Sequence, residues 1–104
     1  MRKVKVYFNG RPAGILEEIE KGSSYHFIYF EDYSGFPISL TMPVENKEYY
    51  CKSFPAFFEG LLPEGFQLEA LLRGAKIDRD DYFSQLMAVG RDMVGCITIE
   101  AVSE

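Results

Sequence analysis

Only a few residues of this 104-residue chain have types and spacings that could support catalysis or metal binding. His26 is the single histidine, and no nucleophile lies near it in the sequence. It falls in an alternating segment, so we interpret it as a solvated or core-edge residue and not as a catalyst. Asp78, Asp80 and Asp81 are better explained as an acidic helix start, because the spacing and distal glutamate of an EF-hand are absent. We therefore predict no catalytic residue, no metal site, no cofactor and no enzymatic activity.

The segment GRDMVG at residues 90–95 comes nearest to a phosphate-binding loop. Its glycine spacing matches neither G-x-x-x-x-G-K-[ST] nor G-x-G-x-x-G, so we do not interpret it as one. Two roles stay open for its charged pair, Arg91 and Asp92. Either the two side chains bond to local backbone groups and fix the turn into the last strand, or they dock against a partner protein.

Charge and cysteine content narrow the class of protein further. The net charge of −5 argues against direct contact with nucleic acid, whose phosphates attract lysine and arginine, and favours a basic partner. The start of the chain has no signal-peptide pattern, and no apolar run approaches the roughly 18 residues of a membrane span. We expect a cytoplasmic protein without membrane contact. Its two cysteines, Cys51 and Cys96, should be free thiols buried as small hydrophobic groups.

Alternating apolar residues predict an antiparallel sheet in the first half of the chain. Asn9-Gly10 is a strong hairpin signal, because both residues tolerate a positive φ. Residues 21–24 form the next expected turn, residues 32–37 a loop, and residues 44–52 a polar irregular stretch. The strands should lie at about residues 4–8, 13–19, 25–30 and 38–42.

Helical spacing and capping residues dominate the second half. Ser53 is the expected cap of a first short helix, which Pro63 and Gly65 interrupt. A second helix should run from Phe66 to Gly74. Asp78 is the expected cap of a third helix, whose apolar face would be Tyr82, Phe83, Leu86, Met87 and Val89, with Gly90 as its stop.

A closing strand near residues 96–102 should pair with the N-terminal sheet. Strands first, helices next and one strand last predict an α+β fold. We expect a single domain over residues 1–104, with an antiparallel β-sheet of about five strands and about three short helices between the fourth and the last strand.

The apolar segment FPAFFEGLLPEGFQLEALL at residues 54–72 is interrupted by Pro63-Glu64-Gly65. Turns expose backbone that must be solvated, so this turn should lie at the surface. Leu62 and Phe66 flank it, and both cannot easily face inward. Phe66 either starts the second helix and packs inside, or stays exposed as an anchor for a partner. Helical spacing predicts that the remaining apolar residues of the segment form core: Phe57, Phe58, Leu61, Leu68, Leu71 and Leu72.

Several phrases of the sequence together resemble the N-terminal subdomain of HipA-type serine/threonine kinase toxins. They are VKVYFNGRPAGILE at the start, then PISLTMP, FFEGLLPEG and YFSQLMAVGRDMVGCITI. They occur in the same order as in that family, and they cover nearly the whole chain. A HipA kinase continues into a nucleotide-binding loop and a catalytic domain, so none of the family's catalytic residues has a counterpart here.

The resemblance implies a stand-alone, HipS-like antitoxin of a HipBST-type toxin–antitoxin system, which binds and neutralises a HipT/HipA-like kinase. The alternative is an excised N-terminal regulatory subdomain of a full-length HipA kinase toxin. Either reading allows for a HipB-like DNA-binding protein in the same complex. The residues that we expect to bind the partner are Leu62, Pro63, Glu64, Gly65, Phe66, Arg91 and Asp92.

Overall fold

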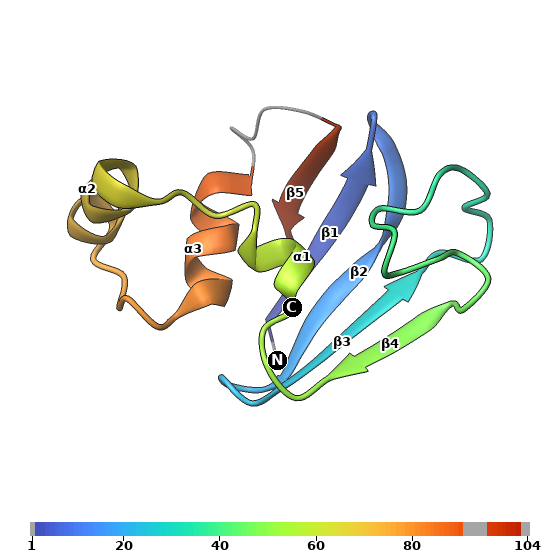
Figure 1. Ribbon diagram of the computed structural model, residues 1–104, viewed down its shortest axis with the longest axis horizontal. Coiled ribbons are helices and arrows are strands. Elements are labelled where there is room, and N and C mark those ends of the chain that lie inside the picture. Colours follow the sequence, from blue (N-terminus) through green and yellow to red (C-terminus); the bar gives the residue numbers. More distant parts are fainter. Residues whose placement is uncertain (1, 91–95, 103–104) are drawn as a thin grey trace.

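The computed structural model describes residues 2–90 and 96–102, and its centre is a five-stranded antiparallel sheet (Figure 1). The strand order is β4-β3-β2-β1-β5, so the last strand joins the N-terminal sheet, as predicted, and pairs there with the first strand. The strands are β1 (Arg2–Phe8), β2 (Arg11–Glu20), β3 (Ser24–Tyr29), β4 (Glu48–Cys51) and β5 (Ile97–Ala101).

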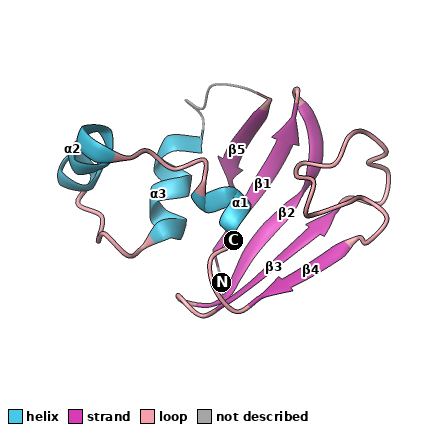
Figure 2. Ribbon diagram, viewed as in Figure 1, coloured by secondary structure: helices cyan, strands magenta, loops and turns pink. Residues whose placement is uncertain are grey.

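Three helices lie between β4 and β5 in the chain (Figure 2). They are α1 (Ala56–Glu59), α2 (Gly65–Ala75) and α3 (Tyr82–Val89). The fold is therefore α+β with the element order predicted from the sequence. Within the described residues, no helix is long and apolar enough to cross a membrane.

The hairpin between β1 and β2 forms at the predicted turn. Asn9 and Gly10 have φ values of 50° and 80°, which is why a residue pair that tolerates positive φ is needed there. The turn sets the register that pairs Val4 with Leu16. Both side chains are fully buried, so the alternation along β1 and β2 directs one face of the sheet to the core.

The core lies between this face and two of the helices. Phe27 and Tyr29 of β3 are fully buried there, as are Phe58 of α1 and the pair Phe83 and Leu86 of α3. The rings of Phe27 and Phe58 pack with their centroids 5.9 Å apart, which joins α1 to the sheet. The apolar faces predicted for the first and third helices are thus largely confirmed.

The opposite face of the sheet carries His26, as the alternation predicted. Its Nδ1 atom lies 3.3 Å from a carboxylate oxygen of Glu17 on β2. Its ring stacks on Tyr50 of β4, with centroids 4.3 Å apart. Tyr50 itself is 71% exposed, so this face is open to solvent at β4.

The predicted fourth strand at residues 38–42 is wrong. These residues form a tight turn with one isolated bridge between Ser39 and Met42. Ile38 and Met42 are buried while Leu40 between them is 96% exposed. The apolar residues Ile38, Leu40 and Met42 alternate as in a strand, but two of them are buried and the one between them is exposed. The real β4 lies in the stretch that we expected to be irregular.

Two predicted helix caps and one predicted burial also differ from the structure. α1 begins after Pro55, which makes no side-chain cap bond, so Ser53 is not its cap. The cap of α3 is Asp81, not Asp78, because the Asp81 carboxylate accepts a hydrogen bond from the backbone N–H of Ser84 at 3.2 Å. Both cysteines are free thiols, but Cys96 is exposed, so its predicted burial is wrong. Cys51 is half-buried, and burial raises the pKa of its thiol.

Candidate functional site

The turn at Pro63-Glu64-Gly65 separates α1 from α2, as the sequence predicted. Glu64 is the N-cap residue of α2 and has extended backbone, with φ −130° and ψ 165°. Gly65 follows with φ +60°, a conformation that a residue with a side chain rarely adopts. The glycine therefore makes the sharp change of direction possible. The Glu64 carboxylate makes no side-chain cap bond to α2.

Phe66, the next residue, is 95% exposed. The alternative in which it packs inside is therefore wrong. Leu62, on the other side of the turn, is half-buried and packs against the core. The turn thus holds Leu62 inward and places a full phenylalanine ring in solvent at the first turn of α2.

Helix α2 contributes no fully buried residue. Leu68, Leu71 and Leu72 are only half-buried and do not join the core cluster, so their prediction as core is wrong. The helix packs against α3 and lies on the far side of α3 from the sheet (Figure 1). Helical spacing shows that a helix has an apolar face, but it does not show whether that face meets the core. Part of the apolar face of α2 therefore remains exposed to solvent.

The first part of the segment behaves as predicted. Phe58 is fully buried, and Phe57 and Leu61 are partly buried side chains that pack against the core cluster. The rings of Phe57 and Phe58 meet edge to face, with centroids 5.2 Å apart. The short α1 therefore anchors the turn to the core, while α2 extends outward from it.

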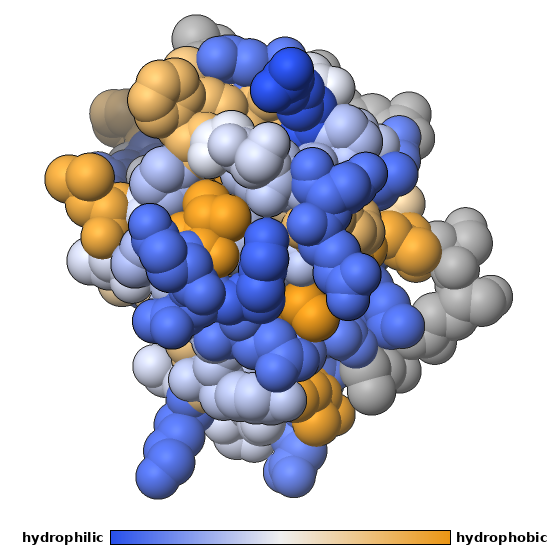
Figure 3. Space-filling model, turned by 90° about the vertical axis from the view of Figure 1, so that its right-hand side faces the viewer, coloured by the Kyte–Doolittle hydropathy of each residue, from blue (hydrophilic) through white to orange (hydrophobic). Residues whose placement is uncertain are grey.

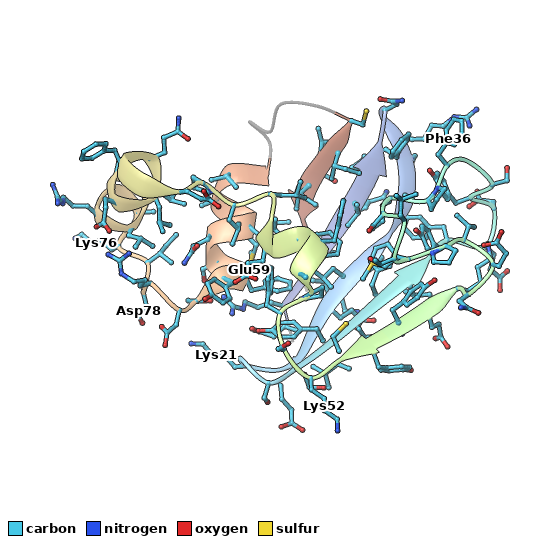
Figure 4. The ribbon with its side chains drawn as sticks, in the orientation of Figure 1. Lys21, Phe36, Lys52, Glu59, Lys76 and Asp78 are labelled. Carbon is cyan, nitrogen blue, oxygen red and sulfur yellow. The ribbon has the colours of Figure 1, made fainter. Side chains whose placement is uncertain are left out.

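A hollow of about 350 Å³ lies between the turn, α2 and α3. Its apolar lining includes Leu62, Pro63, Leu68 and Tyr82. Its polar lining includes three further side chains: Glu59, Glu64 and Gln85. Glu59 comes from α1 and is labelled in Figure 4. Both glutamates are exposed, so this surface combines apolar area with negative charge.

Gln85 is the one buried side chain of this lining, at 1% exposure. Its amide nitrogen donates hydrogen bonds to the carbonyl oxygens of Asp78 and Arg79, at 3.3 Å and 2.8 Å. These carbonyls belong to the connection between α2 and α3. Gln85 thereby fixes the connection to α3, and with it the position of α2.

An ion-pair network holds α3 on the sheet. Arg2 of β1 donates to both carboxylate oxygens of Glu18 at 2.7 Å and 2.9 Å, and to Asp81 at 3.0 Å. It also donates to the hydroxyl of Ser84. Sequence reasoning missed this network, because Arg2 and Asp81 lie 79 residues apart and no local pattern connects them.

This ion-pair network shifts the pKa values of Arg2 and Asp81. Burial of the Asp81 carboxyl opposes its ionisation, but hydrogen bonds from Ser84 and Arg2 outweigh burial and lower its pKa. The hydrogen bond to Glu18 is the main reason that the pKa of Arg2 is raised. Both groups are therefore charged at neutral pH, and the ion pair is fully formed there.

Arg91 and Asp92 lie outside the described residues, so their predicted roles stay predictions. Gly90, just before them, caps α3 as expected. A Cβ atom at Gly90 would lie 2.6 Å from Cβ of Ile99, so only glycine fits against β5 at this point. This contact explains the glycine without reference to phosphate binding.

These features describe an α+β fold in which the turn and α2 expose apolar area, including Phe66, beside the carboxylates of Glu59 and Glu64. The chain belongs to the HipA N-terminal domain family, whose family model matches residues 4–100. That match spans nearly the whole chain and includes the turn, α2 and α3.

Two relatives support the assignment. An uncharacterised protein of Haemophilus influenzae is 33% identical over 100 residues, a match that covers 96% of this chain and 92% of the relative. A solved structure described as the N-terminal domain of HipA toxin has a TM-score of 0.81 and 31% sequence identity. That match covers 100% of this chain and 95% of the solved chain. The fold is thus shared with part of a HipA toxin.

Proposed function

We propose that this protein is a non-catalytic antitoxin that binds and neutralises a HipT/HipA-like serine/threonine kinase toxin. Family membership and the structural match to the N-terminal domain of a HipA toxin support a role connected with that toxin class. The Haemophilus relative is matched over 92% of its own length, so a protein of little more than this domain occurs there. This favours a regulator that acts in trans.

The exposure of Phe66 is the observation that carries the proposal. A phenylalanine that is 95% exposed contributes little to folding, because it leaves almost none of its apolar surface buried. An aromatic ring on a turn of defined backbone loses little side-chain entropy when it docks. Buried aromatic residues often supply much of the binding energy of an interface. Phe66 is therefore the proposed anchor.

The surroundings of Phe66 complete the proposed contact surface. The half-exposed leucines Leu68, Leu71 and Leu72 extend the apolar area along α2. Glu64 is exposed and makes no cap bond, so its carboxylate is available to a basic side chain of the kinase. We propose that this surface docks at or near the active site and blocks it. Arg91 and Asp92 would add to the contact if they point to the partner and not into the turn.

The alternative function uses the same surface within one chain. In an excised subdomain of a full-length HipA kinase, Phe66 and α2 would dock on the kinase domain in cis. In either case we propose a cytoplasmic protein with no direct contact to nucleic acid. A HipB-like DNA-binding protein is the proposed third member of the complex.

The decisive experiment compares two exposed phenylalanines. Phe66→Ala should leave the melting temperature close to that of the wild type, because nearly all of the ring is already in water. It should weaken binding to a purified HipT-like kinase by roughly 30-fold or more, as removal of a hot-spot residue of at least 2 kcal/mol does. Titration calorimetry and a kinase neutralisation assay measure both effects.

Phe36→Ala is the matched control, because Phe36 is 76% exposed and lies in the loop between β3 and β4. It should bind and neutralise the kinase like the wild type. Phe58→Ala sets the scale for a buried ring and should cost about 3–5 kcal/mol of stability. A Phe66→Ala protein that unfolds, or one that is stable and still neutralises the kinase, would contradict the proposal.

A further inference from the structure

Strand β4 (Glu48–Cys51) forms one edge of the sheet, beside β3. Within the described residues, no strand pairs with its outer side. Glu48 and Tyr50 on the strand, and Lys52 directly after it, are exposed. Figure 3 views the molecule from the side on which β4 lies and shows small apolar patches among hydrophilic side chains. An open edge strand of this kind can pair with a strand of another chain.

The outer side of β4 offers backbone groups that can bond to a further strand. The N–H of Tyr29 donates to the carbonyl oxygen of Lys47 at 2.9 Å, directly before β4 begins. Hydrogen-bonded residue pairs alternate along an antiparallel ladder, so every second residue after Lys47 turns its N–H and C=O toward β3. The backbone groups of Glu48 and Tyr50 therefore point away from β3, toward solvent.

The sequence around Tyr50 is complementary to itself. If a second copy pairs with β4 in the antiparallel direction about a two-fold axis at Tyr50, each Tyr50 lies opposite its counterpart. Glu48 of each copy then lies opposite Lys52 of the other copy. Unlike charges and aromatic rings that lie directly opposite each other stabilise antiparallel strands. Charges on an edge strand often prevent pairing, but here the two-fold axis brings opposite charges together. A register shifted by one residue would lose both ion pairs.

His26 of β3 holds two of these side chains in position. Its ring stacks on the Tyr50 ring, with an interplanar angle of 12°. Its Nε2 atom lies 3.4 Å from a carboxylate oxygen of Glu48. Tyr50 nevertheless remains 71% exposed, so most of its ring is available to a second copy. Side chains that are already ordered lose less entropy on association, which favours pairing through this edge.

We propose that β4 is a self-association surface, on which two copies of this chain pair antiparallel about Tyr50 and continue the sheet from one copy into the other. The inference does not depend on the proposed kinase contact. Figure 1 shows α2 and β4 on opposite sides of the molecule, so the dimer leaves both Phe66 surfaces free. A strand pair of about five residues buries less than the roughly 1,200 Å² of a stable interface. We therefore expect a weak dimer, with a Kd of roughly 10 µM to 1 mM.

The experiment measures self-association of the full chain by analytical ultracentrifugation over this range of concentrations. Glu48→Lys and Lys52→Glu should each raise the Kd about fivefold or more, because each substitution places like charges opposite each other at both pairs. An equimolar mixture of the two variants should associate like the wild type. In the mixed dimer, one ion pair is unchanged and the other forms again with its signs exchanged.

The matched controls carry the same changes of charge away from β4. Asp80→Lys and Arg73→Glu alter exposed residues on and beside α2, and they should leave self-association unchanged. Phe66→Ala should also dimerise like the wild type. Circular dichroism of the dilute variants checks their fold. Lys52→Glu is the safer of the two β4 variants, because Lys52 belongs to no ion pair among the described residues, whereas Glu48 contacts His26.

Several outcomes would overturn the inference. A wild type that stays monomeric over the whole range has no such surface. Folded β4 variants that dimerise like the wild type, or a mixture that stays as weak as its components, would exclude pairing in this register. An equal loss in the controls would trace the effect to net charge and not to the edge. Loss of the dimer in Phe66→Ala would place self-association on α2. None of these results bears on whether the protein neutralises a kinase, so the proposed function is judged separately.

Discussion

Arg2 is the residue on which the orientation of α3 depends. It bonds to Glu18 on the neighbouring strand and to Asp81 and Ser84 at the start of α3. Its guanidinium carbon also lies 5.1 Å from the centre of the Phe83 ring. Glu18 is only 6% exposed, so its charge needs this partner. A single side chain near the N-terminus thus connects two strands and a helix.

The first prediction is that Arg2→Ala lowers the free energy of unfolding by about 2–3 kcal/mol, because it leaves the Glu18 carboxylate buried without its partner. Urea unfolding followed by circular dichroism measures the change. Arg73→Ala is the control, since Arg73 is exposed in the last turn of α2, and it should cost less than about 0.5 kcal/mol. Equal effects of the two substitutions would show that the Arg2 network does not stabilise the fold.

The second prediction concerns pH. The pKa of Asp81 is lowered below its ordinary value of 3.8, so the unfolded chain binds a proton more readily than the folded protein in that range. The stabilisation that the ionised Asp81 carboxylate gives to the folded protein is complete above the pKa of Asp81 in the unfolded chain. It is lost as the pH falls through the lower pKa of Asp81 in the folded protein. Asp81→Asn keeps a cap oxygen but removes the charge. It should cost about 1 kcal/mol at neutral pH and progressively less below about pH 4.

Unfolding curves of both proteins at a series of pH values test this. Asp80→Asn is the matched control, because Asp80 is exposed beside Asp81 and belongs to no ion pair among the described residues. It should leave the pH dependence unchanged. A constant difference between wild type and Asp81→Asn from neutral to acid pH would contradict the lowered pKa.

The sequence predicted the residues of the turn but not all of their surroundings. Pro63 and Gly65 indicated the break correctly, because their backbone preferences act locally. The exposure of Phe66 could not be decided, since a helix start is compatible with either direction. The contacts of Arg2 could not be predicted from the sequence, because they join residues that only the complete fold brings together.

At the scale of elements, the loop at residues 30–47 is held by the buried Tyr29 hydroxyl as well as by apolar contacts with the core. Tyr29→Phe is our third prediction. It removes both hydrogen bonds of the buried hydroxyl and leaves the Ile38 N–H and Met42 carbonyl without their partner. The expected cost is about 1–3 kcal/mol of stability. Tyr50→Phe is the control, since Tyr50 is 71% exposed, and it should be nearly neutral.

Burial raises the pKa of Tyr29 to about 12, so the hydroxyl is protonated at neutral pH and able to donate. Burial also raises the pKa of Tyr25 and Tyr33, so ultraviolet titration of the wild type should show several late-ionising tyrosines, of which Tyr29→Phe removes one. Thermal unfolding of the two variants measures the stability change. If Tyr29→Phe and Tyr50→Phe melt alike, water replaces the lost bonds and the loop is not fixed by this hydroxyl.

Elements with local signals were predicted best. The β1–β2 hairpin follows from Asn9-Gly10, and α3 follows from its apolar spacing and Gly90. The fourth strand was misplaced, because β4 has four residues at the edge of the sheet and its pairing with β3 is decided by tertiary contacts. The apolar alternation at residues 38–42 comes from two side chains of a loop, Ile38 and Met42, that are buried in the core. An alternating apolar pattern does not by itself distinguish a strand from such a loop.

At the scale of the whole molecule, stability and proposed function lie in different parts of the chain. The sheet, α1 and α3 share one core, whereas α2 packs outside it and buries no residue fully. Segments with few buried apolar contacts open more easily than the core around them. The proposed Phe66 surface thus lies on a helix that the core does not need, and substitutions there can change binding without unfolding the protein.

The last prediction follows from this separation. In the free protein, amide hydrogens of α2 (Gly65–Ala75) should exchange at least tenfold faster than those of β1 and β2, because opening α2 exposes little of the core. Addition of the HipT-like kinase should slow exchange in α2 and around Phe66, and leave the central strands unchanged. Hydrogen exchange with mass spectrometry measures both states, with the Phe66→Ala protein as the control. Exchange in α2 as slow as in β1 would show that this helix belongs to the cooperative core. Protection that appears only at the β3–β4 loop would place the kinase at the other end of the molecule.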